Sequence, residues 1–123
     1  MKSRALPLLA LLLLAAACER YDVARDAALK QAVTDMRGAI ARFRQDNGRY
    51  PHSLAELVPK YLPQIPTDPF TNSSTTWRVT TEETVQPSSD FQTETVASSP
   101  SVITDVHSTA MGADRNGMLY SNY

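Results

Sequence analysis

One stripe of apolar residues limits the fold of this chain more than any other feature of its sequence. Its members recur at alternating spacings of four and three residues, which is the pattern of one face of an α-helix. They are Leu29, Val33, Met36, Ile40 and Phe43. After them, Gly48 can adopt the left-handed conformation that ends a helix, and Pro51 prevents a restart. We therefore predict a helix over residues 20–47 with one buried face.

The stripe could be buried in two ways. A coiled-coil seam requires three or four heptads, and the stripe from Leu29 to Phe43 supplies about two. Packing on the protein's own sheet is therefore the expected arrangement, and a coiled-coil seam is the alternative.

The stretch from Asp46 to Trp77 continues the chain away from that helix. Ser53 and Glu56 have the S-x-x-E spacing of a capping box, in which each side chain accepts a hydrogen bond from the other residue's backbone N–H. A short helix is predicted over about 54–58. The prolines that follow fix their own backbone and restrict the residues before them, so they favour an extended segment. They are Pro63, Pro66 and Pro69.

Strands are expected from about residue 75 onward. Trp77, Val79 and Thr81 alternate with more polar residues, as in a half-buried strand. Further strands are predicted over 91–97, over 102–107 and around 118–120. One long helix followed by short strands predicts an α+β fold, in which a long N-terminal helix packs on a small antiparallel sheet of three to four strands.

Residues 1–17 have the pattern of a secretory signal peptide. Lys2 and Arg4 form a basic start, and the apolar run from Ala5 to Ala17 follows them. That run of about 13 residues is shorter than the ~20 that span a bilayer as a helix. We predict cleavage after Ala17 and a single domain over residues 18–123.

Cys18 is the single cysteine of the chain, which excludes an intramolecular disulfide. It directly follows Ala15, Ala16 and Ala17, an arrangement that resembles a bacterial lipobox. That resemblance implies that Cys18 becomes the lipidated first residue of the mature protein and anchors it in a membrane. Ordinary cleavage after an alanine, leaving a free thiol, is the alternative.

Charge and chemistry exclude several classes of function. The net charge of −1, with no basic block, gives no basis for non-specific nucleic-acid binding. The two histidines, His52 and His107, have no neighbouring acid or cysteine at a metal-ligand spacing. Nucleophile and phosphate-binding motifs are also missing. No catalytic residue is predicted, and the chain is not expected to be an enzyme.

The loop from Gly112 to Gly117 contains the one candidate metal site. Asp114 and Asn116 are spaced like two oxygen ligands of a calcium loop, although the later bidentate glutamate is missing. The pattern favours the other interpretation, in which the loop is an Asn-Gly turn that links two strands and binds no cofactor.

Several motifs resemble those of the G-type (major) pseudopilins of type II secretion. The chain reads D-x-G-x-Y-P, S-L-x-x-L, Y-L-x-x-I-P-x-D-P-F-T-x-S and D-V-H-S, with Y-S near its end. The matching positions are Asp46, Gly48, Tyr50, Pro51, Leu54, Leu57, Tyr61, Leu62, Ile65, Pro66, Asp68, Pro69, Phe70, Thr71, Ser73, Asp105, Val106, His107, Ser108, Tyr120 and Ser121. The resemblance implies a pilin-like fold and a structural role.

The beginning of the chain departs from that family. Pseudopilins start with a basic leader, a glycine cut by prepilin peptidase, a phenylalanine to be methylated and a glutamate inside the apolar run. No glycine, phenylalanine or glutamate precedes Cys18 here. Thr109 and Tyr123 also replace a usual glycine and tryptophan. Many G-type relatives bind calcium near the C-terminus, but the loop after Ser108 differs, so their ligands are not transferred.

Two functions follow from these features. The first is a pseudopilin-like structural or accessory protein of type II secretion or a pilus-like assembly, whose partners are other pseudopilins or secretion-system proteins. The alternative is a lipid-anchored periplasmic binding or scaffolding lipoprotein unrelated to filaments. Both place the protein in the bacterial cell envelope on the periplasmic side, attached to the inner or outer membrane through Cys18.

Overall fold

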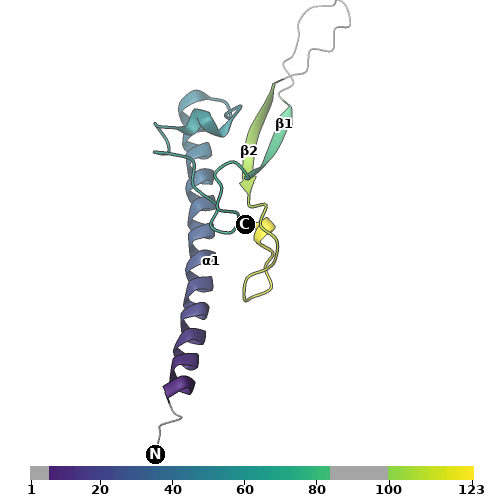
Figure 1. Cartoon of the computed structure of the whole chain (residues 1–123). Coiled ribbons are helices and arrows are strands. Elements are labelled where there is room, and N and C mark those ends of the chain that lie inside the picture. Colours follow the sequence, from purple (N-terminus) through teal and green to yellow (C-terminus); the bar gives the residue numbers. More distant parts are fainter. Residues whose placement is uncertain (1–5, 84–99) are drawn as a thin grey trace, which may run out of the picture.

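The computed structural model describes residues 6–83 and 100–123. One long helix, α1 (Leu6–Asn47), and a two-stranded antiparallel sheet form an α+β structure (Figure 1). The strands are β1 (Arg78–Glu83) and β2 (Ser101–His107), and two short 3₁₀ helices are η1 (Leu54–Leu57) and η2 (Tyr120–Asn122). The strand predicted over 91–97 lies outside the described residues.

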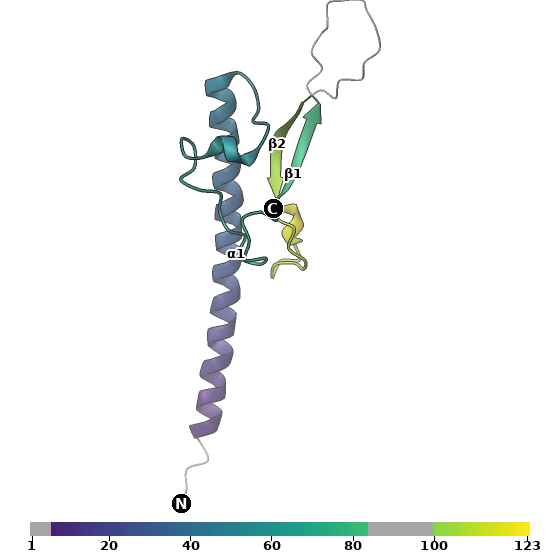
Figure 2. The same ribbon diagram turned by 45° about the horizontal axis from the view of Figure 1, so that its top comes forward.

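Helix α1 ends where the sequence predicts but begins much earlier. Gly48 has a φ of +68°, and its N–H donates to the Arg44 carbonyl at 2.9 Å. At the other end, Pro7 is tolerated because N–H groups of the first turn have no intrahelical partner. Alanine and leucine then favour an unbroken helix. In both views the first part of α1 extends beyond the sheet (Figures 1 and 2).

Among the described residues, no helix combines the length and the apolar character needed to cross a membrane.

The apolar stripe of α1 is buried, as predicted. Its exposed fractions run from 0% at Leu29 to 5% at Phe43. The stripe packs into a cluster with residues from η1, from the proline-rich segment (residues 59–69), from the position before β1 and from β2. They include Leu57, Leu62, Trp77, Ile103 and Val106. The prediction that this face packs on the protein's own sheet holds for β2, while η1 and the proline-rich segment cover the stripe as well.

The two strands pair from Arg78 opposite His107 to Glu83 opposite Ser101, with an irregularity between Thr80 and Thr81. Trp77 is buried just before β1, Val79 is half-buried and Thr81 is exposed. The predicted alternation therefore holds only as far as the irregularity. The strand predicted over 102–107 is confirmed, since β2 covers it.

The strand predicted around 118–120 is wrong. Leu119 forms one isolated bridge with Ala113. The N–H groups of Asn122 and Tyr123 then donate to the carbonyls of Leu119 and Tyr120, which closes the 3₁₀ turn of η2. The Tyr120 ring lies 4.1 Å from the Phe70 ring, between centroids.

The predicted capping box is also wrong. Ser53 precedes η1 but makes no side-chain cap hydrogen bond. Glu56 accepts instead from the His52 N–H at 2.7 Å and from the Arg49 guanidinium at 2.9 Å. The turn is therefore held from the preceding loop, and it is a single 3₁₀ turn over Leu54–Leu57 rather than an α-helix over 54–58.

The proline-rich segment is attached at both ends. Asp46, near the end of α1, accepts from Lys60 at 2.9 Å and from the Tyr61 hydroxyl at 3.0 Å. The Trp77 indole N–H donates to the Pro66 carbonyl at 2.8 Å. These contacts fix the segment to the end of α1 and to Trp77, and its residues Leu62 and Ile65 pack on the apolar cluster.

Burial of the stripe can be tested with two valines of α1. Val33 is 2% exposed and Val23 is 49% exposed. Val33→Ala should lower the free energy of unfolding by about 2 kcal/mol, because it removes buried methyl groups and leaves a cavity. Val23→Ala should change it by less than about 0.5 kcal/mol. Urea denaturation followed by circular dichroism measures both, and equal losses would contradict the arrangement.

Candidate functional site

The Asp114 carboxylate holds the C-terminal loop to α1. Its Oδ1 accepts from the backbone N–H groups of Asn116 at 2.8 Å and Met118 at 2.9 Å. Its Oδ2 accepts from the Tyr123 hydroxyl at 2.5 Å and lies 3.6 Å from Lys30 Nζ. The side chain is 4% exposed, so both oxygens are enclosed by partners from the chain itself.

These partners shift the ionisation of the group. The Tyr123 hydroxyl, followed by the Met118 N–H, lowers the pKa of Asp114 to about 2. Contact with Tyr123 raises the pKa of Lys30 against the effect of desolvation, and Asp114 adds to the increase. The hydrogen bond to Asp114 in turn raises the pKa of the Tyr123 hydroxyl. At neutral pH the carboxylate and the ammonium are therefore both charged.

The two residues predicted as weak metal candidates do come together, but Asn116 contributes its backbone N–H. The Gly117 N–H donates to the Asp114 carbonyl at 3.0 Å, and Gly117 has a φ of +80°, so the loop is a tight turn. Within the described residues, no group of three or more histidine, cysteine, aspartate or glutamate side chains could hold a metal ion. The absence of a cofactor stays a prediction, with calcium at this loop as its alternative, and calcium would require Tyr123 or Lys30 to release the carboxylate.

The predicted cleavage residue Ala17 and the predicted lipidation residue Cys18 are consecutive residues of α1. They precede Leu29, where the buried stripe begins. The backbone helix passes through both without a break.

A buried carboxylate joins the proline-rich segment to the end of β2. Asp68 and Ser108 are both fully buried. Asp68 Oδ2 accepts from the Ser108 hydroxyl at 2.5 Å, and its Oδ1 accepts from the N–H groups of Phe70 at 2.8 Å and Thr71 at 3.3 Å. The Ser108 oxygen also accepts from the Ala110 N–H at 2.9 Å. The serine therefore serves as a hydrogen-bond donor inside the fold.

Sequence reasoning missed a third cluster, which joins α1, β2 and the C-terminal segment. Arg37 Nε donates to Asp105 Oδ1 at 2.6 Å, and His107 Nε2 lies 3.3 Å from Asp105 Oδ2. His107 Nδ1 lies 3.1 Å from the Tyr123 carbonyl oxygen. Burial opposes ionisation of Asp105, but hydrogen bonds from Arg37 and the Val106 N–H outweigh it and lower the pKa of this carboxyl.

Part of this cluster could have been found in the sequence. Asp105 and His107 are two residues apart on one strand, so they face the same side. Arg37, in contrast, is 68 residues away from Asp105, and no local pattern relates the two.

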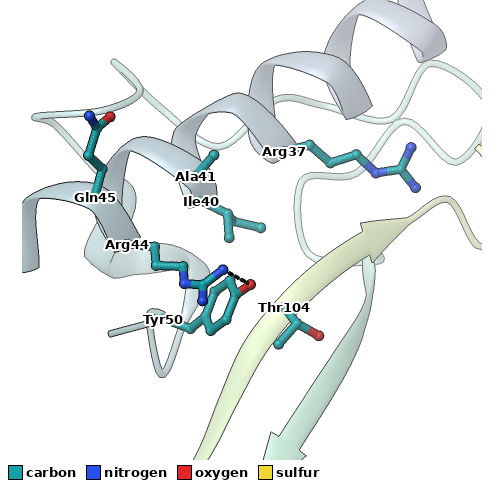
Figure 3. A pocket seen from close by; sticks show the side chains of 7 residues that line it. All are labelled: Arg37, Ile40, Ala41, Arg44, Gln45, Tyr50 and Thr104. Carbon is teal, nitrogen blue, oxygen red and sulfur yellow. Dashed lines mark hydrogen bonds between the residues drawn. The ribbon is translucent and has the colours of Figure 1, made fainter. Parts of the chain in front are cut away.

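A groove of about 380 Å³ lies beside this cluster, between α1 and β2 (Figure 3). Its clearest polar contact joins Arg44 Nη1 to the Tyr50 hydroxyl at 2.8 Å. The Arg44 guanidinium carbon also lies 4.6 Å from the centroid of the Tyr50 ring. The lining residues are Arg37, Ile40, Ala41, Arg44, Gln45, Tyr50 and Thr104.

Three polar joints thus connect the segments of the chain, and we name them by their residues. They are Lys30–Asp114–Tyr123, Asp68–Ser108 and Arg37–Asp105–His107. Each joint satisfies its charged groups from within the chain, so its chemical effect is to fix segments relative to one another. No protein-family model, curated protein or solved structure matches the chain.

The Asp68–Ser108 joint should contribute measurably to stability. Ser108→Ala removes the hydroxyl donor from a buried carboxylate, which should lower the free energy of unfolding by about 1–3 kcal/mol. Ser53→Ala is the matched control, because Ser53 is exposed and caps nothing, and it should cost less than about 0.5 kcal/mol. Urea denaturation measures both. A larger loss from Ser53→Ala would restore the capping box and contradict this assignment.

The Lys30–Asp114–Tyr123 joint should make stability depend on pH. The pKa of Asp114 falls from an ordinary 3.8 to about 2 in the folded chain, so the contribution is complete above the ordinary value and is lost as the pH falls toward 2. The difference in stability between the wild type and Asp114→Asn should therefore shrink across that window.

Urea midpoints measured from neutral pH down to acid would show this convergence. Asn116→Ala is the control, since only the backbone of Asn116 contacts Asp114. This variant should keep the wild-type pH dependence. A constant difference between the wild type and Asp114→Asn at all pH values would contradict the prediction.

Proposed function

We propose that this chain is a non-enzymatic, pseudopilin-like structural or accessory protein of type II secretion or of a pilus-like assembly. One observation carries the proposal. Several positions that match the motifs of G-type pseudopilins make contacts that connect segments of this fold: Asp46 binds Lys60, Asp68 binds Ser108, and Asp105 binds Arg37. Several of the positions that carry the resemblance therefore stabilise the fold.

The arrangement of α1 gives further support. The apolar stripe on its second half packs against the rest of the chain, whereas its first part extends beyond the sheet (Figure 2). Such a helix can present a compact domain at a distance from an anchor. A pilin-like fold with a sheet of three to four strands is part of the proposal, and the described residues supply the helix and two strands.

A second candidate is a lipid-anchored periplasmic binding or scaffolding lipoprotein that does not join filaments. The sequence before Cys18 favours it, because three alanines end at a cysteine, as in a bacterial lipobox. In both candidates residues 1–17 direct export, Cys18 carries the lipid, and the domain faces the periplasm from the inner or outer membrane.

Labelling with a palmitate analogue tests the anchor. The wild type should incorporate the label, and Cys18→Ala should lose it, because acylation requires the thiol. Cys18→Ser is a closer control for size and polarity and should also lose the label. Absence of label in the wild type, together with cleavage by prepilin peptidase, would contradict lipidation.

Crosslinking in cells that express a type II secretion system separates the two candidates. A photocrosslinking residue at exposed Thr34 of α1 should capture a pseudopilin if the chain is an accessory subunit. Labelled protein that captures no secretion-system component would favour the unrelated lipoprotein.

A further inference from the structure

We propose that the groove between α1 and β2 binds the carboxylate side chain of a partner polypeptide, and that Arg44 receives this carboxylate. We call it the Arg44 groove, lined by the seven residues named above (Figure 3). The proposal deepens the proposed function by naming a contact site. It rests on that function only for the choice of a polypeptide as the ligand.

Ion pairing distinguishes Arg44 from Arg37, the other arginine of the groove. Arg37 is already paired with Asp105 at 2.6 Å. Among the ion pairs of residues 6–83 and 100–123, none includes Arg44. A guanidinium has five N–H donors, and here one of them donates to the Tyr50 hydroxyl. The remaining donors suit a carboxylate, which arginine binds in a bidentate geometry.

Tyr50 holds the guanidinium in place before any ligand arrives. The centroid of its ring lies 4.6 Å from the guanidinium carbon of Arg44, and its hydroxyl accepts a hydrogen bond from Arg44 Nη1. Tyr50 is itself fixed, because the next residue, Pro51, is buried and its carbonyl accepts from the Ile103 N–H at 2.7 Å. An ordered arginine loses less conformational entropy on binding than a free one.

The shape of the groove favours a side chain from a polypeptide. Ile40 and Ala41 are the apolar residues that line the groove on α1 next to Arg44, and Thr104 lines it on β2 (Figure 3). Sites for small molecules usually bury about 70–90% of their ligand. This groove is open to solvent and cannot do so alone, whereas a partner polypeptide closes the open side with its own surface.

A second groove of about 520 Å³ beside η1 offers a contrast. Its lining has no charged side chain, so no cation in it would attract a carboxylate. Its residues are Ala55, Val58, Gln64, Ile65, Thr67 and Ser74.

The test uses the full chain, labelled with ¹⁵N in a non-ionic detergent, and blocked tripeptides as probes. Leu-Glu-Leu should shift the Arg44 side-chain N–H signal and the Tyr50 and Thr104 amide signals in a saturable way. Leu-Gln-Leu has the same shape without the charge and should bind about tenfold more weakly. Free 4-methylpentanoate, a small acid with an apolar body, should bind more weakly than Leu-Glu-Leu.

Three variants localise the binding. Arg44→Gln should weaken Leu-Glu-Leu about tenfold. Arg42→Gln is the matched control, because Arg42 lies on the same helix but donates to the Tyr61 carbonyl and does not line the groove, so affinity should stay within about twofold. Tyr50→Phe keeps the ring and removes the hydroxyl that orients Arg44, and it should weaken binding by about threefold. Circular dichroism melting confirms that each variant is folded.

Several results would overturn the proposal: no saturable shift with Leu-Glu-Leu, equal binding of Leu-Gln-Leu, or unchanged affinity in Arg44→Gln. If 4-methylpentanoate binds as tightly as the tripeptide, the ligand is a small carboxylic acid and the assignment to a polypeptide is wrong. None of these outcomes affects labelling at Cys18, so failure here is distinguishable from failure of the proposed function.

Discussion

Burial of one face of α1 is the interaction on which the rest of this structure depends. The stripe from Leu29 to Phe43 is withdrawn from water by residues that come from η1, the proline-rich segment and β2. Because β2 is distant in sequence from η1 and the proline-rich segment, the apolar cluster is what brings all three to the same helix face. The three polar joints lie around this cluster, and each then fixes one segment in a defined orientation.

The parts of the fold that the sequence predicts are those with a local pattern. The stripe, the end of α1 at Gly48 and the strand β2 follow from periodicity and from one glycine. The capping box failed for an instructive reason. Ser53 and Glu56 have the right spacing, yet Glu56 also has Arg49 and the His52 N–H within reach, and these partners bind it instead. Spacing shows which hydrogen bonds are available but not which of them form.

The candidate metal site illustrates the same limit. Asp114 and Asn116 have the spacing of oxygen ligands, and the carboxylate does collect donors, but Tyr123 and Lys30 supply two of them from distant positions. A pattern within six residues cannot reveal a tyrosine after the loop or a lysine on the long helix. The Arg37–Asp105–His107 joint was hidden for the same reason. Long-range polar contacts depend on packing that has to be known first.

Several basic side chains of the described residues bind groups of the chain itself, either carboxylates or neutral oxygens. Lys30, Arg37, Arg49 and Lys60 each face a carboxylate of the same chain. Arg25, Arg42 and Arg78 donate to backbone carbonyls. Arg44 is oriented by the hydroxyl and the ring of Tyr50 instead, and it lines the groove between α1 and β2. Because an ordered cation beside apolar surface is suited to an anionic partner, the Arg44 groove differs in kind from the polar joints that stabilise the fold.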